Sequence, residues 1–391
     1  MITLFAALAI LSPTPAAETL AIRAEILHTQ EDAPIKNGVV LIEDGKIKAV
    51  GTADQVTIPT GTRVLRAAVV TPGLIDARST LGLTGIYNQQ GHDQDQQDIG
   101  GAVQPELRAM DAYNPREALI SYVRSYGITT VNTGHAAGSL MSGQTFVVKL
   151  HGRTPDADSV KSPSFVLATL GPGSLGRGPG TRAKQLSELR DVFRGAQRAA
   201  KAGTAKGQKA DALQLVITKK IPLLVTAYTS QDIASALRLK KEFGFDMVLD
   251  GGAEATTMAA ELKAAKVPVF IHPLMQRPYG EAQNVSYETP AKLQNLGISF
   301  AFTSGFEGYV PKVRVVLMEA AVAVANGLSD ADALNGLTLG AAKLLGIEKR
   351  TGSLAVGKDA DLALFDGDPF EYTSHCTATV IDGKVLWEGK R

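Results

Sequence analysis

Apolar and polar positions alternate over short stretches at both ends of the chain, with turn residues between them. Near the N-terminus two apolar runs flank Asp44-Gly45, and near the C-terminus two more flank Asp382-Gly383. An Asp-Gly pair between β-rich runs is a signal for a hairpin. The pattern predicts a small β-sandwich domain built from both termini, over residues 18–66 and 351–391.

The middle of the chain, residues 67–350, alternates apolar β-branched runs with helical patterns. Eight such runs predict the strands of a (β/α)₈ TIM barrel, an α/β fold whose site lies at the C-terminal ends of the strands. Helices are expected at 115–126, 181–202, 231–243, 255–265 and 313–326. The strand runs lie at 68–75, 128–132, 145–150, 164–170, 222–227, 246–250, 267–272 and 298–303.

Residues 1–17 are typical of a secretory signal peptide. An apolar run from Leu4 to Leu11 precedes a stretch of small residues suited to cleavage. No Lys or Arg lies before that run, and a buried N-terminal strand or helix is the alternative. The run is too short to span a bilayer, and no other segment is long or apolar enough. We therefore expect an exported, periplasmic protein with no membrane span after signal removal.

Composition narrows the possible partners of this chain. It has 391 residues, a hydrophobic fraction of 45% and a formal net charge of +1, so it is globular and offers no electrostatic reason to bind nucleic acid. Cys376 is its single cysteine, which excludes an internal disulfide. No Gly-x-Ser-x-Gly elbow is present, and Cys376 lies in the predicted terminal sheet, so nucleophilic catalysis has no support.

Two long motifs identify a family resemblance. The run Val69-Val70-Thr71-Pro72-Gly73-Leu74-Ile75-Asp76-Ala77-Arg78-Ser79-Thr80-Leu81-Gly82 resembles the start of the catalytic barrel in the amidohydrolase superfamily. Residues 352–362 resemble the segment that closes the family's small β domain. The nearest branch looks like the imidazolonepropionase-like and prolidase-like members, a similarity carried by residues 105–115 and 142–152. The resemblance covers nearly the whole mature chain and implies a metal-dependent hydrolase scaffold.

The resemblance also shows what is missing on the first strand. In the family this signature ends in Asp-Ala-His-Ser-His-Leu-Gly, and its two histidines hold a catalytic metal. Here Arg78 and Thr80 stand at those positions. A guanidinium cannot ligate a metal, and it would repel a dication held a few ångströms away.

The same alignment finds no ligand on the other metal-binding strands. Thr226 and Tyr228 stand where the fifth strand carries histidines, and Gly251 replaces the histidine of the sixth. Gly305 replaces the eighth-strand aspartate, which in the family binds metal and takes a proton from water. Leu167 stands where binuclear members carry a bridging lysine. We therefore expect no metal and no cofactor in this site.

A replacement metal site is not indicated by the six histidines. No two of them have the i, i+2 spacing in a strand or the i, i+4 spacing on a helix that favours shared ligation. His135, His151 and His272 follow the second, third and seventh predicted strands, and they could face the barrel mouth. Local hydrogen bonding is the simpler role for each.

The leading hypothesis is a catalytically inactive amidohydrolase homologue, a pseudoenzyme that works as a binding or partner subunit. It would form a homodimer or a hetero-oligomer with an active relative, since family members commonly associate. Arg78 either anchors a carboxylate of a small acidic ligand or pairs with Asp250.

Two alternatives stay open. One is a hydrolase of C–N bonds in small amides or dipeptides, with a rearranged or metal-free site. Lys149, Tyr228, His135 and His272 are its candidate groups, although no spacing fixes their geometry. The other is an exported protein that binds a small acidic ligand.

Overall fold

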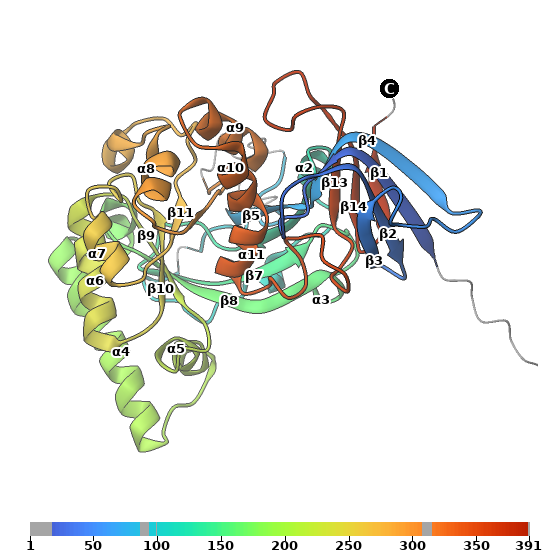
Figure 1. Ribbon diagram of the computed structural model, residues 1–391. Coiled ribbons are helices and arrows are strands. Elements are labelled where there is room, and N and C mark those ends of the chain that lie inside the picture. The colour runs from blue at the N-terminus through green and yellow to red at the C-terminus, as the bar shows by residue number, and fades with distance from the viewer. Residues whose placement is uncertain (1–17, 87–93, 99, 307–314, 390–391) are drawn as a thin grey trace, which may run out of the picture.

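The computed structural model describes residues 18–86, 94–98, 100–306 and 315–389 (Figure 1). The signal segment expected at 1–17 lies outside these residues. Two sheets organise the described chain, one of seven strands and one of eight. In this part of the chain no helix combines the length and the apolar character needed to cross a membrane.

The seven-stranded sheet is built from both ends of the chain, as predicted. Its order is β15-β14-β13-β4-β1-β2-β3. Both expected hairpins form, and φ is positive at Asp44, Gly45, Asp382 and Gly383, as tight hairpin turns require. The strands are β1 (Thr19–Leu27), β2 (Ile35–Glu43), β3 (Lys46–Thr52), β4 (Arg63–Pro72), β13 (Leu362–Phe365), β14 (Cys376–Ile381) and β15 (Lys384–Glu388).

This sheet curls so that one of its edges meets the segment that precedes β13. The Ile47 N–H donates to the Lys358 carbonyl at 3.0 Å, and the Ala360 N–H donates to the Gly45 carbonyl at 2.9 Å. Apolar side chains from β1, β2, β13 and β14 are thereby enclosed in one cluster. The burial of these side chains stabilises a small domain whose strands come from distant parts of the chain.

The chain changes sheets at Gly73. The single strand predicted at 68–75 is two strands, because β4 ends at Pro72 in the small sheet and β5 begins at Leu74 in the other. A Cβ at position 73 would lie 2.3 Å from Thr129 Cγ2, so only glycine allows this close approach. The domain boundary expected at residue 66 therefore falls within β4.

The eight remaining strands form the barrel, which confirms the predicted α/β barrel with a separate β domain. Their order runs from β5 to β12 without interruption. The Ala77 N–H donates to the Phe302 carbonyl at 3.2 Å and the Gly305 N–H donates to the Arg78 carbonyl at 3.0 Å, which closes the sheet. The strands are β5 (Leu74–Ser79), β6 (Ile128–Thr133), β7 (Met141–Lys149), β8 (Ser159–Thr169), β9 (Leu223–Ala227), β10 (Met247–Gly251), β11 (Val269–Ile271) and β12 (Phe300–Ala301).

Strand β7 interrupts the regular alternation expected of a TIM barrel. It pairs antiparallel with both β6 and β8. Only residues 134–140 join β6 to β7, too few for the crossover that a parallel neighbour needs. The end of β7 therefore lies beside the start of β6, with Lys149 opposite Thr130. Lys149 and His151 are consequently at the barrel end opposite the mouth.

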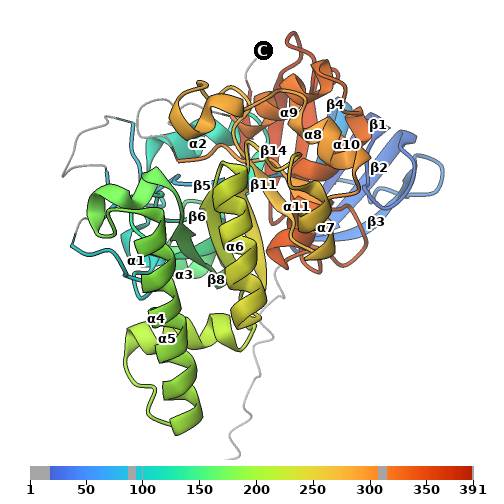
Figure 2. The same cartoon turned by 90° about the vertical axis from the view of Figure 1, so that its left-hand side faces the viewer.

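Helices pack around the outside of the barrel, and the β domain lies on the side away from α6 and α7 (Figure 1). Figure 2 shows α4 and α5 extending away from the barrel. The predicted helices correspond to α2, α4, α6, α7 and α9. Helices and short 3₁₀ turns are α1 (Ala109–Ala112), α2 (Ala118–Arg124), α3 (Pro155–Asp158), η1 (Pro172–Arg177), α4 (Arg182–Ala202), α5 (Gln208–Ile217), α6 (Ser230–Phe243), α7 (Ala259–Ala264), η2 (Gly280–Asn284), α8 (Thr289–Asn295), α9 (Val316–Ala325), α10 (Asp330–Leu337) and α11 (Leu339–Leu345).

A buried ion cluster joins the barrel to the β domain. Lys149 Nζ lies 2.7 Å from Asp359 Oδ2 and 3.0 Å from Asp361 Oδ2, and it also contacts Asp382. Burial opposes the charge on Lys149, but the three carboxylates outweigh it and raise its pKa. Burial likewise works against ionisation of Asp359, yet the hydrogen bond and charge of Lys149 lower its pKa to about 2.

Replacing Lys149 by Met should destabilise the protein by about 3–5 kcal/mol, because buried carboxylates lose their shared cation. Lys46→Gln is the matched control: Lys46 contacts the same Asp359, but its side chain is 55% exposed. That control should cost no more than about 1 kcal/mol. Urea unfolding followed by circular dichroism measures both. Equal losses for the two variants would contradict a central role for Lys149.

Candidate functional site

The mouth of the barrel is filled by a buried arginine. Arg78, at the end of β5, has 0% of its surface exposed. Its Nη1 donates to the Ser79 carbonyl at 2.9 Å and to the Gly134 carbonyl at 3.3 Å, and Nη2 donates to the His135 carbonyl. The Phe306 ring covers the guanidinium, with its centroid 5.2 Å from Cζ. Most of the donors on Arg78 are therefore already used by backbone carbonyls.

Asp250, on β10, supplies the counter-charge. Its Oδ2 lies 3.9 Å from Arg78 Nε and accepts a hydrogen bond from Thr226 Oγ1 at 2.7 Å. Burial raises the pKa of Asp250, while Arg78 and Thr226 oppose that shift. Of the two roles considered for Arg78, pairing with Asp250 is the one that this geometry favours. The guanidinium is enclosed and cannot reach a ligand in solvent.

Two of the former ligand positions have backbones suited to glycine. Gly251 has φ of 90°, and a Cβ there would lie 3.1 Å from the Tyr228 ring. Gly305 has φ of 79°, and a Cβ there would lie 2.6 Å from Pro273 Cγ. L-residues rarely adopt such φ values. A histidine or aspartate at these positions would therefore strain the backbone and displace its neighbours.

Thr80, at the other first-strand position, makes a local contact. Its hydroxyl accepts from Thr84 Oγ1 at 3.1 Å, and its side chain is buried. Among the described residues, no three His, Cys, Asp or Glu side chains are grouped so that they could hold a metal ion. The described side chains at the mouth therefore do not fit the dication that the family resemblance implies.

Two buried histidines lie at the strand ends. His272, after β11, has Nδ1 3.1 Å from the Pro273 carbonyl, while its Nε2 has no partner among the described residues. His135, after β6, likewise leaves Nδ1 without a described partner. Burial lowers the pKa of each to about 4, and for His135 the charge of Arg78 contributes. Both imidazoles are therefore neutral near pH 7.

The predicted site residues are only partly brought together. Arg78, Thr226, Tyr228 and His272 come from strand ends at the mouth, and Tyr228 faces Gly251. Lys149 is not with them, because the reversed direction of β7 carries it to the interface with the β domain. The sign of that reversal in the sequence was the short stretch between the predicted strands 128–132 and 145–150, which has no predicted helix for a parallel crossover.

Sequence reasoning missed the role of Asp76. This carboxylate, on β5, accepts from the Ser304 N–H at 3.0 Å and from the Ser304 hydroxyl, and so ties β5 to the segment after β12. Burial raises the pKa of Asp76 to about 6, against these hydrogen bonds. The signal was an acidic residue inside the apolar run Leu74-Ile75-Asp76-Ala77, where a partner is required.

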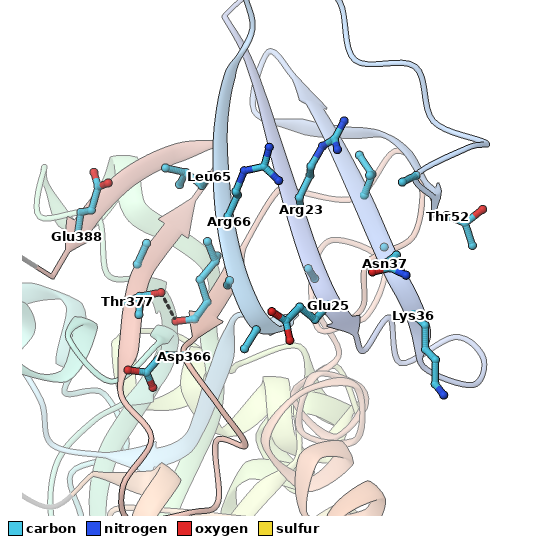
Figure 3. Close-up of a pocket in the computed structure, with 18 of the residues that line it drawn as sticks. Arg23, Glu25, Lys36, Asn37, Thr52, Leu65, Arg66, Asp366, Thr377 and Glu388 are labelled. Atoms are coloured by element: carbon cyan, nitrogen blue, oxygen red, sulfur yellow. Dashed lines mark hydrogen bonds between the residues drawn. The ribbon is translucent and has the colours of Figure 1, made fainter. Parts of the chain in front are cut away.

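A large cavity lies away from the mouth, on the seven-stranded sheet (Figure 3). Its volume is about 1100 Å³. Charged side chains of both signs line it, among them Arg23, Glu25, Lys36, Arg66 and Glu388. This cavity was not predicted, because its residues come from strands that are far apart in the chain.

Comparisons with known proteins agree with this architecture. The sequence model of the Amidohydrolase family matches residues 91–387. The imidazolonepropionase of Streptococcus pyogenes serotype M1 is 22% identical, over 91% of this chain and 90% of that protein. The crystal structure of an amidohydrolase from Thermotoga maritima MSB8 superposes with a TM-score of 0.87 at 27% identity, over 95% of this chain and 100% of that chain. A prolidase structure with N-methylphosphonate-L-proline, at 15% identity, a TM-score of 0.60 and coverage of 95% and 100%, shares the fold.

The Asp76→Asn variant tests the electrostatics of the mouth. The folded-state pKa of Asp76, about 6, exceeds its ordinary 3.8, so folding favours the protonated carboxyl. Its contribution to stability is complete below about pH 4 and is lost as the pH rises through 6. Asparagine cannot ionise, so the stability of the wild type relative to the variant should fall by about 1–3 kcal/mol between pH 4 and 7. Urea unfolding across this range measures it; Asp211→Asn, on the exposed surface of α5, should show no such trend.

Proposed function

The chain belongs to the amidohydrolase family, and from that premise we propose that it is a catalytically inactive homologue that works as a binding or partner subunit. The observation that carries this proposal is the enclosure of Arg78. A permanent cation, hydrogen-bonded to three carbonyls, lies where the family resemblance places the first-strand metal ligands. Its charge opposes binding of a second cation nearby.

The backbone supports the same conclusion. Gly251 and Gly305 have left-handed conformations, and neighbouring rings fill the space that a side chain would need. Restoring the first-strand histidines would therefore leave two ligand positions without side chains. A general base at position 305 is also missing, and glycine offers no group to take a proton from water.

A partner role is favoured because the scaffold is retained at full length. The chain spans 90% of the imidazolonepropionase that it resembles and 100% of the Thermotoga chain. A barrel kept nearly whole, with an emptied mouth, is consistent with selection for its surface rather than its chemistry. We include export to the periplasm in this proposal, based on the apolar run in residues 1–17.

The double variant Arg78→His/Thr80→His tests the proposal directly. We expect neither near-stoichiometric zinc, measured by mass spectrometry of the purified protein, nor hydrolysis of small amides or dipeptides. The single variant Arg78→Met should be destabilised by about 3–5 kcal/mol, because Asp250 loses its counter-charge. About one zinc ion per wild-type chain, or metal-dependent amide hydrolysis by the wild type, would contradict the proposal that the protein is catalytically inactive.

The partner role needs a separate experiment. Affinity purification of the tagged, full-length protein from its native host should recover either a second copy of the chain or an amidohydrolase with intact ligands. Multi-angle light scattering of the eluate distinguishes these two outcomes. A monomer recovered without any such relative would contradict the partner version.

One observation favours the alternative of a rearranged C–N hydrolase. His272 Nε2 and His135 Nδ1 are buried near the mouth without described partners, and a neutral imidazole can act as a base. The similar proteins include an imidazolonepropionase and a prolidase. If a metal-free wild type hydrolysed dipeptides and His272→Gln abolished the activity, this alternative would replace the first.

A further inference from the structure

Two arginines are direct neighbours in the seven-stranded sheet. Strands β1 and β4 pair in parallel, with Arg23 opposite Arg66. Adjacent strands lie about 4.8 Å apart, so the two side chains leave the sheet close together. Figure 3 shows both on the same side of the sheet, pointing in a similar direction. Like charges at paired positions destabilise a sheet, which makes this arrangement unfavourable without an anion.

The described residues supply no such anion. No hydrogen bond or ion pair joins Arg23 or Arg66 to another described side chain, and Arg23 Nε is buried without a partner. Elsewhere on the same strand, Arg63 pairs with Glu388 at 2.6 Å. The charge of Arg63 is therefore neutralised by an ion pair, whereas the charges of Arg23 and Arg66 are not. A buried donor without an acceptor carries a desolvation cost that a bound ligand would remove.

The pair lines the cavity of about 1100 Å³ on this face, a size typical of sites for small organic molecules. Glu25 also lines it, two residues beyond Arg23 on the same strand and face. The two positions are about 7 Å apart along the strand. This carboxylate would repel a polyanion, and it would attract an ammonium group on a ligand whose anionic end lies at the arginines.

We propose that this cavity binds a small zwitterion of the amino-acid or short-peptide class. Its carboxylate is held between Arg23 and Arg66, where guanidinium groups give strong, charge-assisted hydrogen bonds. Its ammonium group faces Glu25. The site is separate from the barrel mouth and does not depend on whether the barrel is catalytic. Binding of a carboxylate, one of the two roles considered for Arg78, is thereby assigned to an arginine pair that solvent can reach.

Three small probes separate the two charges. Glycylglycine carries both charged groups, N-acetylglycine only the carboxylate, and glycinamide only the ammonium. Titration calorimetry of the whole protein should give saturable binding in the order glycylglycine, then N-acetylglycine, with none for glycinamide. Absence of saturable binding for both carboxylate probes would overturn the proposal, as would equal binding of glycinamide.

Variants test the assigned roles. Arg23→Gln and Arg66→Gln should each weaken N-acetylglycine binding at least about tenfold, since each removes charge-assisted hydrogen bonds. Glu25→Gln should weaken glycylglycine but leave N-acetylglycine unchanged or slightly tighter. Lys48→Gln is the control: it removes a cation from the same sheet, on β3, outside the cavity lining. Unchanged binding in both arginine variants would refute the assignment.

Stability gives a readout that general damage to the fold would not imitate. Removing either arginine relieves repulsion in the free protein, so Arg23→Gln and Arg66→Gln should raise the thermal midpoint by about 1–2 °C at low salt. Saturating glycylglycine should raise the midpoint of the wild type but not of these variants. A lowered midpoint in both variants, together with unchanged binding, would mean that the arginines serve packing alone.

Discussion

A guanidinium buried in a barrel mouth needs partners for its donors and its charge, and parts of the chain far apart in sequence supply most of them to Arg78, although its Nε has no described hydrogen-bond partner. Carbonyls at the end of β5 and after β6 accept its hydrogen bonds, and Asp250 on β10 balances its charge. Since breaking a buried pair leaves an uncompensated charge, the strand ends depend on one another. The guanidinium of Arg78 thus holds the strand ends at the mouth together.

The buried cation changes what the barrel, an architecture shared with the amidohydrolases, can do at its mouth. The family resemblance implies strand ends that converge on a metal ion, with an open coordination position where water is activated. Here the positive charge is part of a side chain, and glycines occupy two positions where ligands would project. In the described structure the positive charge at this place is a structural element, held by backbone carbonyls and by Asp250.

Charged side chains are arranged in two different ways outside the barrel mouth. Lys149 gathers three aspartates at the barrel end opposite the mouth and fixes the β domain to the barrel. On the outer sheet, Arg23 and Arg66 are adjacent, and neither has an ion-pair partner among the described residues. Side chains of the protein itself balance the charge of Lys149. For Arg23 and Arg66, we propose that a bound ligand supplies the anion. Comparing the two distinguishes a structural ion cluster from a candidate ligand site in the same molecule.

Local sequence determined much of this protein: the Asp-Gly hairpins, the eight barrel strands and the principal helices. These follow from side-chain type and periodicity, which are properties of neighbouring residues. Only the tertiary structure decided that β7 runs backwards, that Gly73 divides one apolar run between two sheets, and that Arg78 is enclosed while Arg23 faces Arg66. The physical reason is that strand direction and pairing depend on contacts between distant segments, and an apolar run has the same pattern in either direction.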